Sequence, residues 1–240
     1  MARQAYIRKK HPEIHFNTVG SRLRDFILGW QDGLVNVLGV VLAVAIATQD
    51  KKLVIIAALA AAFAESVSMA AVAYTSFKAE KEFYQSELAR EKQEIRYKPE
   101  EERREVRDIY RKIGFREPLL GRVVKFMTSD KKRWLTSMME HELKLFPQKV
   151  SPINTAIVVG ISAIVGSFIP IIPFLLLPIN TAVQYALVIS TTVLFAVGYY
   201  KAKTTIGNPI KSGIEMAVIG MLAALIGYAI GAVLGVAVLG

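Results

Sequence analysis

The 240-residue sequence contains no cysteine. This absence excludes disulfides, thiolate metal sites, iron–sulfur clusters and cysteine nucleophiles. Histidine is scarce as well, since only His11, His15 and His141 occur, and the chain lacks the two Glu-x-x-His pairs of a ferritin-like di-iron site. Gly-rich loops of the Walker type are also missing, which argues against ATP-driven pumping. We therefore predict a protein that is not an enzyme and has no tightly bound cofactor.

Charged side chains are absent from the 51 consecutive residues between Val150 and Tyr200. A helix needs only about 20 apolar residues to cross a bilayer, so this stretch is long enough for two crossings. The whole chain is 53% hydrophobic and yet has a net charge of +10, so its charges are concentrated in separate segments. This segregation predicts a multi-pass membrane protein and argues against nucleic acid as a partner.

Uncharged apolar windows predict five transmembrane helices. The first two are separated only by residues 49–52, which predicts a tight helical hairpin. Pro170, Pro173 and Pro178 are expected to form the turn between the third and fourth, because proline removes a backbone donor and disfavours helix in the preceding residue. The predicted spans are Phe26–Thr48, Leu53–Phe77, Ile153–Ile172, Ile179–Tyr200 and Ser212–Gly240.

Lysine and arginine in the short loops predict how the spans are oriented, because these residues resist translocation. The first 25 residues contain six of them and the loop 201–211 contains three, whereas the loop 49–52 contains two. This bias predicts a cytosolic N-terminus and, with five spans, a C-terminus on the opposite side. The polar, basic start of the chain predicts no cleavable signal peptide. We expect a prokaryotic cell membrane rather than a vacuolar membrane.

Residues 78–150 form a charged insert with 19 Lys and Arg and 14 Asp and Glu. The absence of Gly and Pro over 78–97 predicts that the second span continues into the insert as one helix. Further helices are predicted over 99–114, between a starting proline and a terminal glycine, and over 117–127. A last helix is predicted to start after Asp130, its N-cap, and to reach Leu145.

The predicted fold class is therefore an all-α membrane protein with five transmembrane helices and a cytosolic helical domain inserted between spans 2 and 3. Its parts are a cytosolic segment (1–25), a transmembrane hairpin (26–77), the cytosolic helical domain (78–150) and the last three spans (151–240).

Two acidic residues, Asp32 and Glu65, lie inside the first and second predicted spans. Burying an ionised carboxylate in hydrocarbon costs about 3 kcal/mol or more, so such groups usually face a cavity, a partner or an ion path. Met69 follows Glu65 by four residues and shares its helix face. These residues predict a membrane path with one hard and one soft ligand. The alternative for Glu65 is a protonated carboxyl group that is bonded to a neighbouring helix.

Carboxylates recur along one face of the first helix of the insert and again at Glu102 and Glu105. On the last helix, Met138, Met139 and Glu142 are close in sequence. Oxygen ligands suit Mg²⁺, Ca²⁺ or Mn²⁺, and thioether sulfur shifts the preference toward softer ions such as Fe²⁺. The alternatives are a solvated face with Glu–Lys pairs and simple core packing of the methionines.

Gly227, Gly231 and Gly235 repeat at every fourth position of the fifth span. This doubled GxxxG pattern predicts close helix packing, and contact between protomers is one of the arrangements that it would serve.

Taken together, the motifs of the spans and of the insert resemble those of the vacuolar iron transporter family. The resemblance rests on Asp32-Gly33-Leu34-Val35, on Ser68-Met69-Ala70, on the Glu-rich insert, on the Met138-Met139-x-x-Glu142 run and on three further spans. It implies a five-span homodimer that exchanges Fe²⁺, or a similar divalent ion such as Mn²⁺, for protons. The ion path would lie between the first and second helices of the two protomers.

The same resemblance implies roles for single residues. Asp32 and Met69 would line the membrane path. Many relatives have a glutamate where this chain has Ala73, and Glu65 is expected to serve in its place. The cytosolic metal ligands would be Glu91, Glu94, Glu102, Glu105, Met138, Met139 and Glu142.

We therefore expect an antiporter that moves Fe²⁺ out of the cytosol, with divalent metal ions, protons, the bilayer and a second copy of the chain as partners. One alternative is a membrane-anchored metal sensor or buffer without transport. Another is a membrane ferroxidase, which the missing histidines disfavour.

Overall fold

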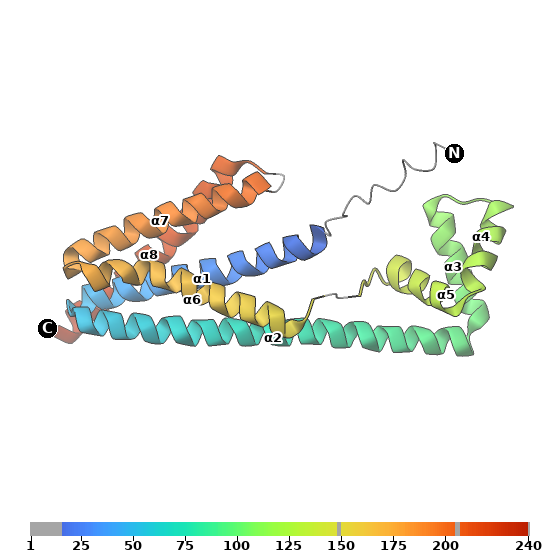
Figure 1. The fold of residues 1–240 in the computed structure, drawn as a ribbon, viewed down its shortest axis with the longest axis horizontal. Helices are drawn as coiled ribbons and strands as arrows, with labels where there is room; N and C mark the ends of the chain where they lie inside the picture. Colours follow the sequence, from blue (N-terminus) through green and yellow to red (C-terminus); the bar gives the residue numbers. More distant parts are fainter. Residues whose placement is uncertain (1–15, 148–149, 205–206, 240) are drawn as a thin grey trace, which may run out of the picture. The chain divides into compact units, whose positions relative to one another are not determined.

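The computed structural model describes residues 16–147, 150–204 and 207–239, and Figure 1 shows their helices. Within these ranges the chain has eight α-helices, one π-helical turn and no strand. Five helices are long and apolar enough to cross a membrane, which confirms the five predicted spans. They are α1 (Phe16–Thr48), α2 (Lys51–Tyr97), α6 (Pro152–Leu176), α7 (Ile179–Thr204) and α8 (Pro209–Leu239).

The chain divides into two compact units. The transmembrane unit comprises Met1–Tyr74 and Pro152–Gly240, and the insert unit comprises Thr75–Ser151. Helix α2 belongs to both, because it continues without a break from the second span into the insert, as its lack of Gly and Pro predicted.

Helix α1 is central to the transmembrane unit, where it packs against α6, α7 and α8. Its large side chains Leu34, Leu38 and Leu42 are buried and repeat at helical spacing. Glycine allows the closest approach to α6, because a Cβ atom at Gly33 would overlap the backbone carbonyl oxygen of Ala163.

The doubled GxxxG pattern of α8 packs against α1 of the same chain. A Cβ atom at Gly227 would overlap the carbonyl oxygen of Gly39, and one at Gly231 would overlap that of Ala43. One turn further on, a Cβ atom at Gly235 would lie 2.9 Å from the Cα of Ala47. This small-residue face is therefore used within the protomer.

Helix α2 contacts the other helices of the transmembrane unit through a narrow stripe of side chains on one face. Val54, Ala58, Ala62 and Ser66 recur at every fourth position and are buried. The Ser66 hydroxyl donates a hydrogen bond to the carbonyl oxygen of Gly160 at 2.7 Å. The remaining apolar faces of this span are exposed in the single chain.

The predicted turn between the third and fourth spans was partly wrong. Helix α6 continues through Pro170 and Pro173, and the break comes only between Leu176 and Ile179, at Pro178. Both internal prolines are buried, and packing by neighbouring helices makes proline tolerable inside a membrane helix. The Lys51 ammonium donates to the carbonyl oxygen of Leu175 at 3.2 Å, so the α1–α2 and α6–α7 turns lie at the same end of the unit.

The insert unit contains α3 (Pro99–Ile113), α4 (Leu119–Thr128), α5 (Lys131–Ser137) and the π-helical turn η2 (Met138–Glu142). Helix α3 begins and ends as predicted, with Gly114 at a φ of 120° as its C-cap. The predicted N-cap Asp130 is confirmed, because its side chain accepts a hydrogen bond from the Arg133 amide at 2.8 Å.

The prediction of a single helix from Asp130 to Leu145 was wrong in its second half. At Met138 the helix changes to π geometry, in which the Leu143 amide donates to the Met138 carbonyl at 3.1 Å. The helix then ends at Glu142, and Lys144 has a positive φ of 56°, which a right-handed helix does not allow. Spacing rules for an α-helix therefore do not apply to Met138, Met139 and Glu142.

We expect Gly231→Ala to lower the apparent melting temperature of the detergent-solubilised chain by several degrees, because overpacking costs about 1–3 kcal/mol. Gly39→Ala is the matched control, since a Cβ atom there would make only an ordinary contact, at 3.6 Å from the Ala223 carbonyl oxygen. Equal melting temperatures for the two variants would contradict the intramolecular α1–α8 contact.

Candidate functional site

Five carboxylates gather in the insert unit from three elements that are distant in sequence. Glu91 and Glu94 come from α2, Glu102 and Glu105 from α3, and Glu142 from η2. The negative charges of Glu91, Glu94 and Glu105 raise the pKa values of both Glu102 and Glu142, so all five groups are close enough to interact. The structure thus brings together all five glutamates that the sequence predicted as metal ligands.

Two of these carboxylates are buried without full hydrogen bonding. Glu91 is 2% exposed and Glu102 is 4% exposed. One oxygen of each, Oε2, has no hydrogen-bond partner among the described residues. A buried carboxylate oxygen without a partner is costly, and a bound cation would remove that cost.

The electrostatics of the cluster favour protonation when no cation is bound. Burial raises the pKa of Glu102 to about 7, and the charges of Glu105, Glu91, Glu94 and Glu142 add to this shift. Burial also raises the pKa of Glu142 to about 7, with Glu105 as the next largest cause. The pKa values of Glu91 and Glu105 are raised by burial and then by Glu94.

Arg90 partly neutralises the cluster. Its guanidinium lies 2.8 Å from Glu87, 3.6 Å from Glu91 and 3.7 Å from Glu94. In the described part of the chain, no three acidic or histidine side chains are close enough together to hold a metal ion. Without a cation the carboxylates repel one another, and Arg90 occupies the face of α2 on which two of them lie. A metal ion held by these carboxylates would therefore require rotation of their side chains and displacement of the Arg90 guanidinium.

The two methionines are fully buried beside the carboxylates. Met138 is 0% exposed and packs in the apolar core of the insert with Ile95, Val106 and Trp134. Met139 is 1% exposed and is not part of that core cluster. Met138 thus packs as a core residue, which was the alternative to a ligand role, whereas Met139 is buried outside the apolar cluster.

In the transmembrane unit, α1 and α2 bring two carboxyl groups together. The side chain of Glu65 on α2 interacts with those of Asp32 and Asn36, which lie one turn apart on α1. Asp32, Glu65 and Met69 are half-buried. Asp32 and Glu65, which the sequence predicted for the same membrane path, are therefore neighbours in the structure.

Sequence analysis missed two residues of these sites. Asn36 could have been found as the polar residue four positions after Asp32 in an apolar span. Arg90 could have been found because it stands three residues after Glu87 and four before Glu94, the spacing of helical ion pairs.

Comparison with known proteins places these sites in a family. Residues 23–232 match the sequence model of a family described as the VIT family. The chain belongs to the VIT family. The matched region of this VIT-family chain includes the entire insert and the two spans, in α1 and α2, that hold Asp32 and Glu65. The resemblance to vacuolar iron transporters is thereby confirmed.

Three relatives show how far the similarity extends. Vacuolar iron transporter 1 of Arabidopsis thaliana is 34% identical over 215 residues, covering 89% of this chain and 86% of that protein. Vacuolar iron transporter 1 of Oryza sativa subsp. japonica is 34% identical over 223 residues, covering 91% and 87%. A vacuolar iron transporter of Toxoplasma gondii is 30% identical over 235 residues, covering 93% and 78%.

We expect Mn²⁺ to bind the insert more tightly at pH 8 than at pH 6. The pKa values of Glu102 and Glu142 are about 7, so below neutrality a metal ion must displace their protons. Affinity should rise by up to about tenfold per pH unit for each displaced proton. Calorimetry in buffers of different ionisation enthalpy would count the protons released. Glu102→Gln should reduce that number, and pH-independent binding without proton release would contradict the assignment.

We also expect Arg90→Gln to increase Mn²⁺ affinity several-fold, because it removes the cation that competes for Glu91 and Glu94. Arg122→Gln, which removes an exposed positive charge on α4, is the matched control. A lower affinity in Arg90→Gln would show that Arg90 organises the site instead of competing with the metal.

Proposed function

We propose that this chain is a proton-coupled transporter that moves a divalent metal ion, Fe²⁺ above all, out of the cytosol. The observation that carries the proposal is the contact between Glu65 and Asp32 within two membrane spans. Intramembrane carboxyl groups mark ion paths and proton relays, because their burial in lipid would otherwise be unfavourable.

The carboxyl pair offers a mechanism for exchange. Two carboxyl groups can hydrogen-bond to each other only while one of them keeps a proton, because a carboxylate has no donor. A divalent cation bound between Asp32 and Glu65 would take the place of that proton. On the side with the higher proton concentration, protonation would release the metal. A proton gradient directed toward the cytosol would therefore drive metal into the opposite compartment, and Met69, one turn from Glu65, would supply a softer ligand for Fe²⁺.

The insert would collect metal for this path. Its buried carboxylates need a cation, and the excess of Lys and Arg in the N-terminal segment and in the loop 201–211 favours a cytosolic position for the insert. The relatives in Arabidopsis thaliana and Oryza sativa are named vacuolar iron transporters, which supports metal as the cargo of this chain.

A homodimer through α2 would complete the path. Ala60, Ala64 and Ser68 are small, lie four residues apart and are exposed in the single chain. Such small residues allow two membrane helices to approach closely. The corresponding face of α8 is already used against α1, which leaves α2 as the better dimer face and brings Glu65 close to the second protomer.

A membrane-anchored metal sensor or buffer is less well supported. The insert alone would suffice for that role, and the Asp32–Glu65 contact would have no purpose in a passive anchor. Accumulation of Fe²⁺ or Mn²⁺ inside sealed proteoliposomes, with and without an imposed pH gradient, separates the two functions.

We expect Asp32→Asn to abolish metal uptake by such vesicles at every metal concentration, because asparagine keeps the size of aspartate but cannot exchange a proton for a cation. Glu102→Gln combined with Glu105→Gln should instead slow uptake mainly at low metal, because it weakens capture. Asp108→Asn, on the exposed surface of α3, is the matched control and should transport normally.

Two outcomes would overturn this assignment. Wild-type flux through Asp32→Asn vesicles at saturating metal would exclude Asp32 from the path. Equal flux with and without a pH gradient in the parent protein would indicate a channel.

A further inference from the structure

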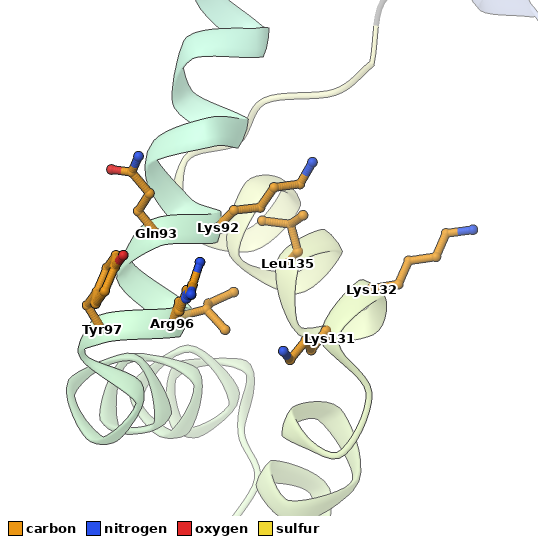
Figure 2. Close-up of a pocket in the computed structure, with 8 residues that line it drawn as sticks. Lys92, Gln93, Arg96, Tyr97, Lys131, Lys132 and Leu135 are labelled. Carbon is orange, nitrogen blue, oxygen red and sulfur yellow. The ribbon is translucent and has the colours of Figure 1, made fainter.

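A basic hollow lies within the insert unit, between the last turns of α2 and the start of α5. Its volume is about 630 Å³, which is within the range of about 300–1,000 Å³ typical of small-molecule sites. Figure 2 shows Lys92 extending from α2 toward Leu135 of α5, with Arg96 on the next turn of α2 and Lys131 at the start of α5. Lys132 also lines the hollow, so four cationic residues contribute to its walls.

None of the ion pairs within the described residues involves Lys92, Arg96, Lys131 or Lys132. Clefts lined by charges of one sign concentrate counter-ions, so this hollow attracts anions.

The position of two of the lysines is unfavourable for the helix itself. Lys131 and Lys132 are the first two residues of α5, where the helix dipole favours acidic side chains. The Asp130 carboxylate at the N-cap of α5 offsets part of this cost. Lys131 and Lys132 themselves do not stabilise α5, and both side chains line the hollow.

The hollow also has an apolar and aromatic side. Ile95 and Leu135 line it together with Tyr97, whose ring lies 5.4 Å from the Arg96 guanidinium. The ring is exposed and can stack against a planar group, while the edge of the guanidinium can hydrogen-bond to phosphate oxygens. An anion with a planar or apolar body matches this lining better than a simple ion does.

We propose that the hollow between α2 and α5 is a binding site for an organic polyphosphate, a molecule with two or more phosphate groups on a planar or apolar body. The phosphates contact Lys92, Arg96 and Lys131, and the body lies against Tyr97 and Leu135. A nucleotide and a phosphoinositide headgroup share this chemistry. The site is separate from the carboxylate cluster, so the inference does not depend on the proposed transport function.

The test is calorimetric titration of the full-length chain, in nanodiscs of zwitterionic lipid and without divalent cations, with ATP and with inorganic triphosphate. We expect saturable binding of ATP that weakens as salt is added. Lys131→Glu combined with Lys132→Glu should weaken ATP binding by about tenfold or more, because charge-assisted hydrogen bonds are replaced by repulsion. Tyr97→Ala should weaken the binding of ATP and leave that of inorganic triphosphate unchanged.

The matched control is Arg122→Glu combined with Lys125→Glu, which reverses two exposed charges on α4 away from the hollow. Equal losses in the two double variants would show that only net charge matters and would overturn the site. Absence of saturable binding by the parent chain to ATP and to phosphoinositide vesicles would also overturn it. Binding to the vesicles alone would identify a lipid headgroup as the source of the polyphosphate. If the parent chain binds no anion and the Lys131→Glu, Lys132→Glu variant has a changed oligomeric state, the hollow is a protein interface and the proposal is overturned.

Discussion

Buried carboxylates that Arg90 neutralises only in part are the main electrostatic constraint on the insert. Glu91 precedes Ile95 by one helical turn, and Glu102 precedes Val106 by one turn, so each carboxylate lies on the face that packs into the core. Packing of the apolar side chains therefore forces the carboxylates inward. Protonation, which the raised pKa of Glu102 favours, reduces the repulsion between the carboxylates, and so does the positive charge of Arg90. A divalent ion would reduce this repulsion more completely.

The transmembrane unit is governed by how closely backbones approach. Glycines let α1 touch α6 on one face and α8 on another, which leaves a third face, with Asp32 and Asn36, directed at Glu65 on α2. Helix α2 itself is attached by a narrow stripe of small residues. The polar contact therefore lies on the face of α1 that the glycine-mediated contacts leave free.

The positions of the helices were largely predictable, because they depend on local chemistry. Asp130 caps α5 through its own side chain, and the run without Gly or Pro makes α2 continuous. The prediction failed where neighbours override local preference. Pro170 and Pro173 lie inside α6 because surrounding helices bury them, and the helix after Ser137 becomes a π turn instead of continuing to Leu145.

The sequence by itself determined the number of spans and the charged insert, because hydropathy, charge and helical spacing are properties of neighbouring residues. Only the tertiary structure decided which groups meet. It joined Asp32 to Glu65, placed Arg90 against the glutamates and put the glycines of α8 against α1 of the same chain. It also placed four cationic residues from two helices in the walls of one hollow. Contacts between distant segments depend on which helix faces pack together, and the periodicity of a single helix does not specify its partner.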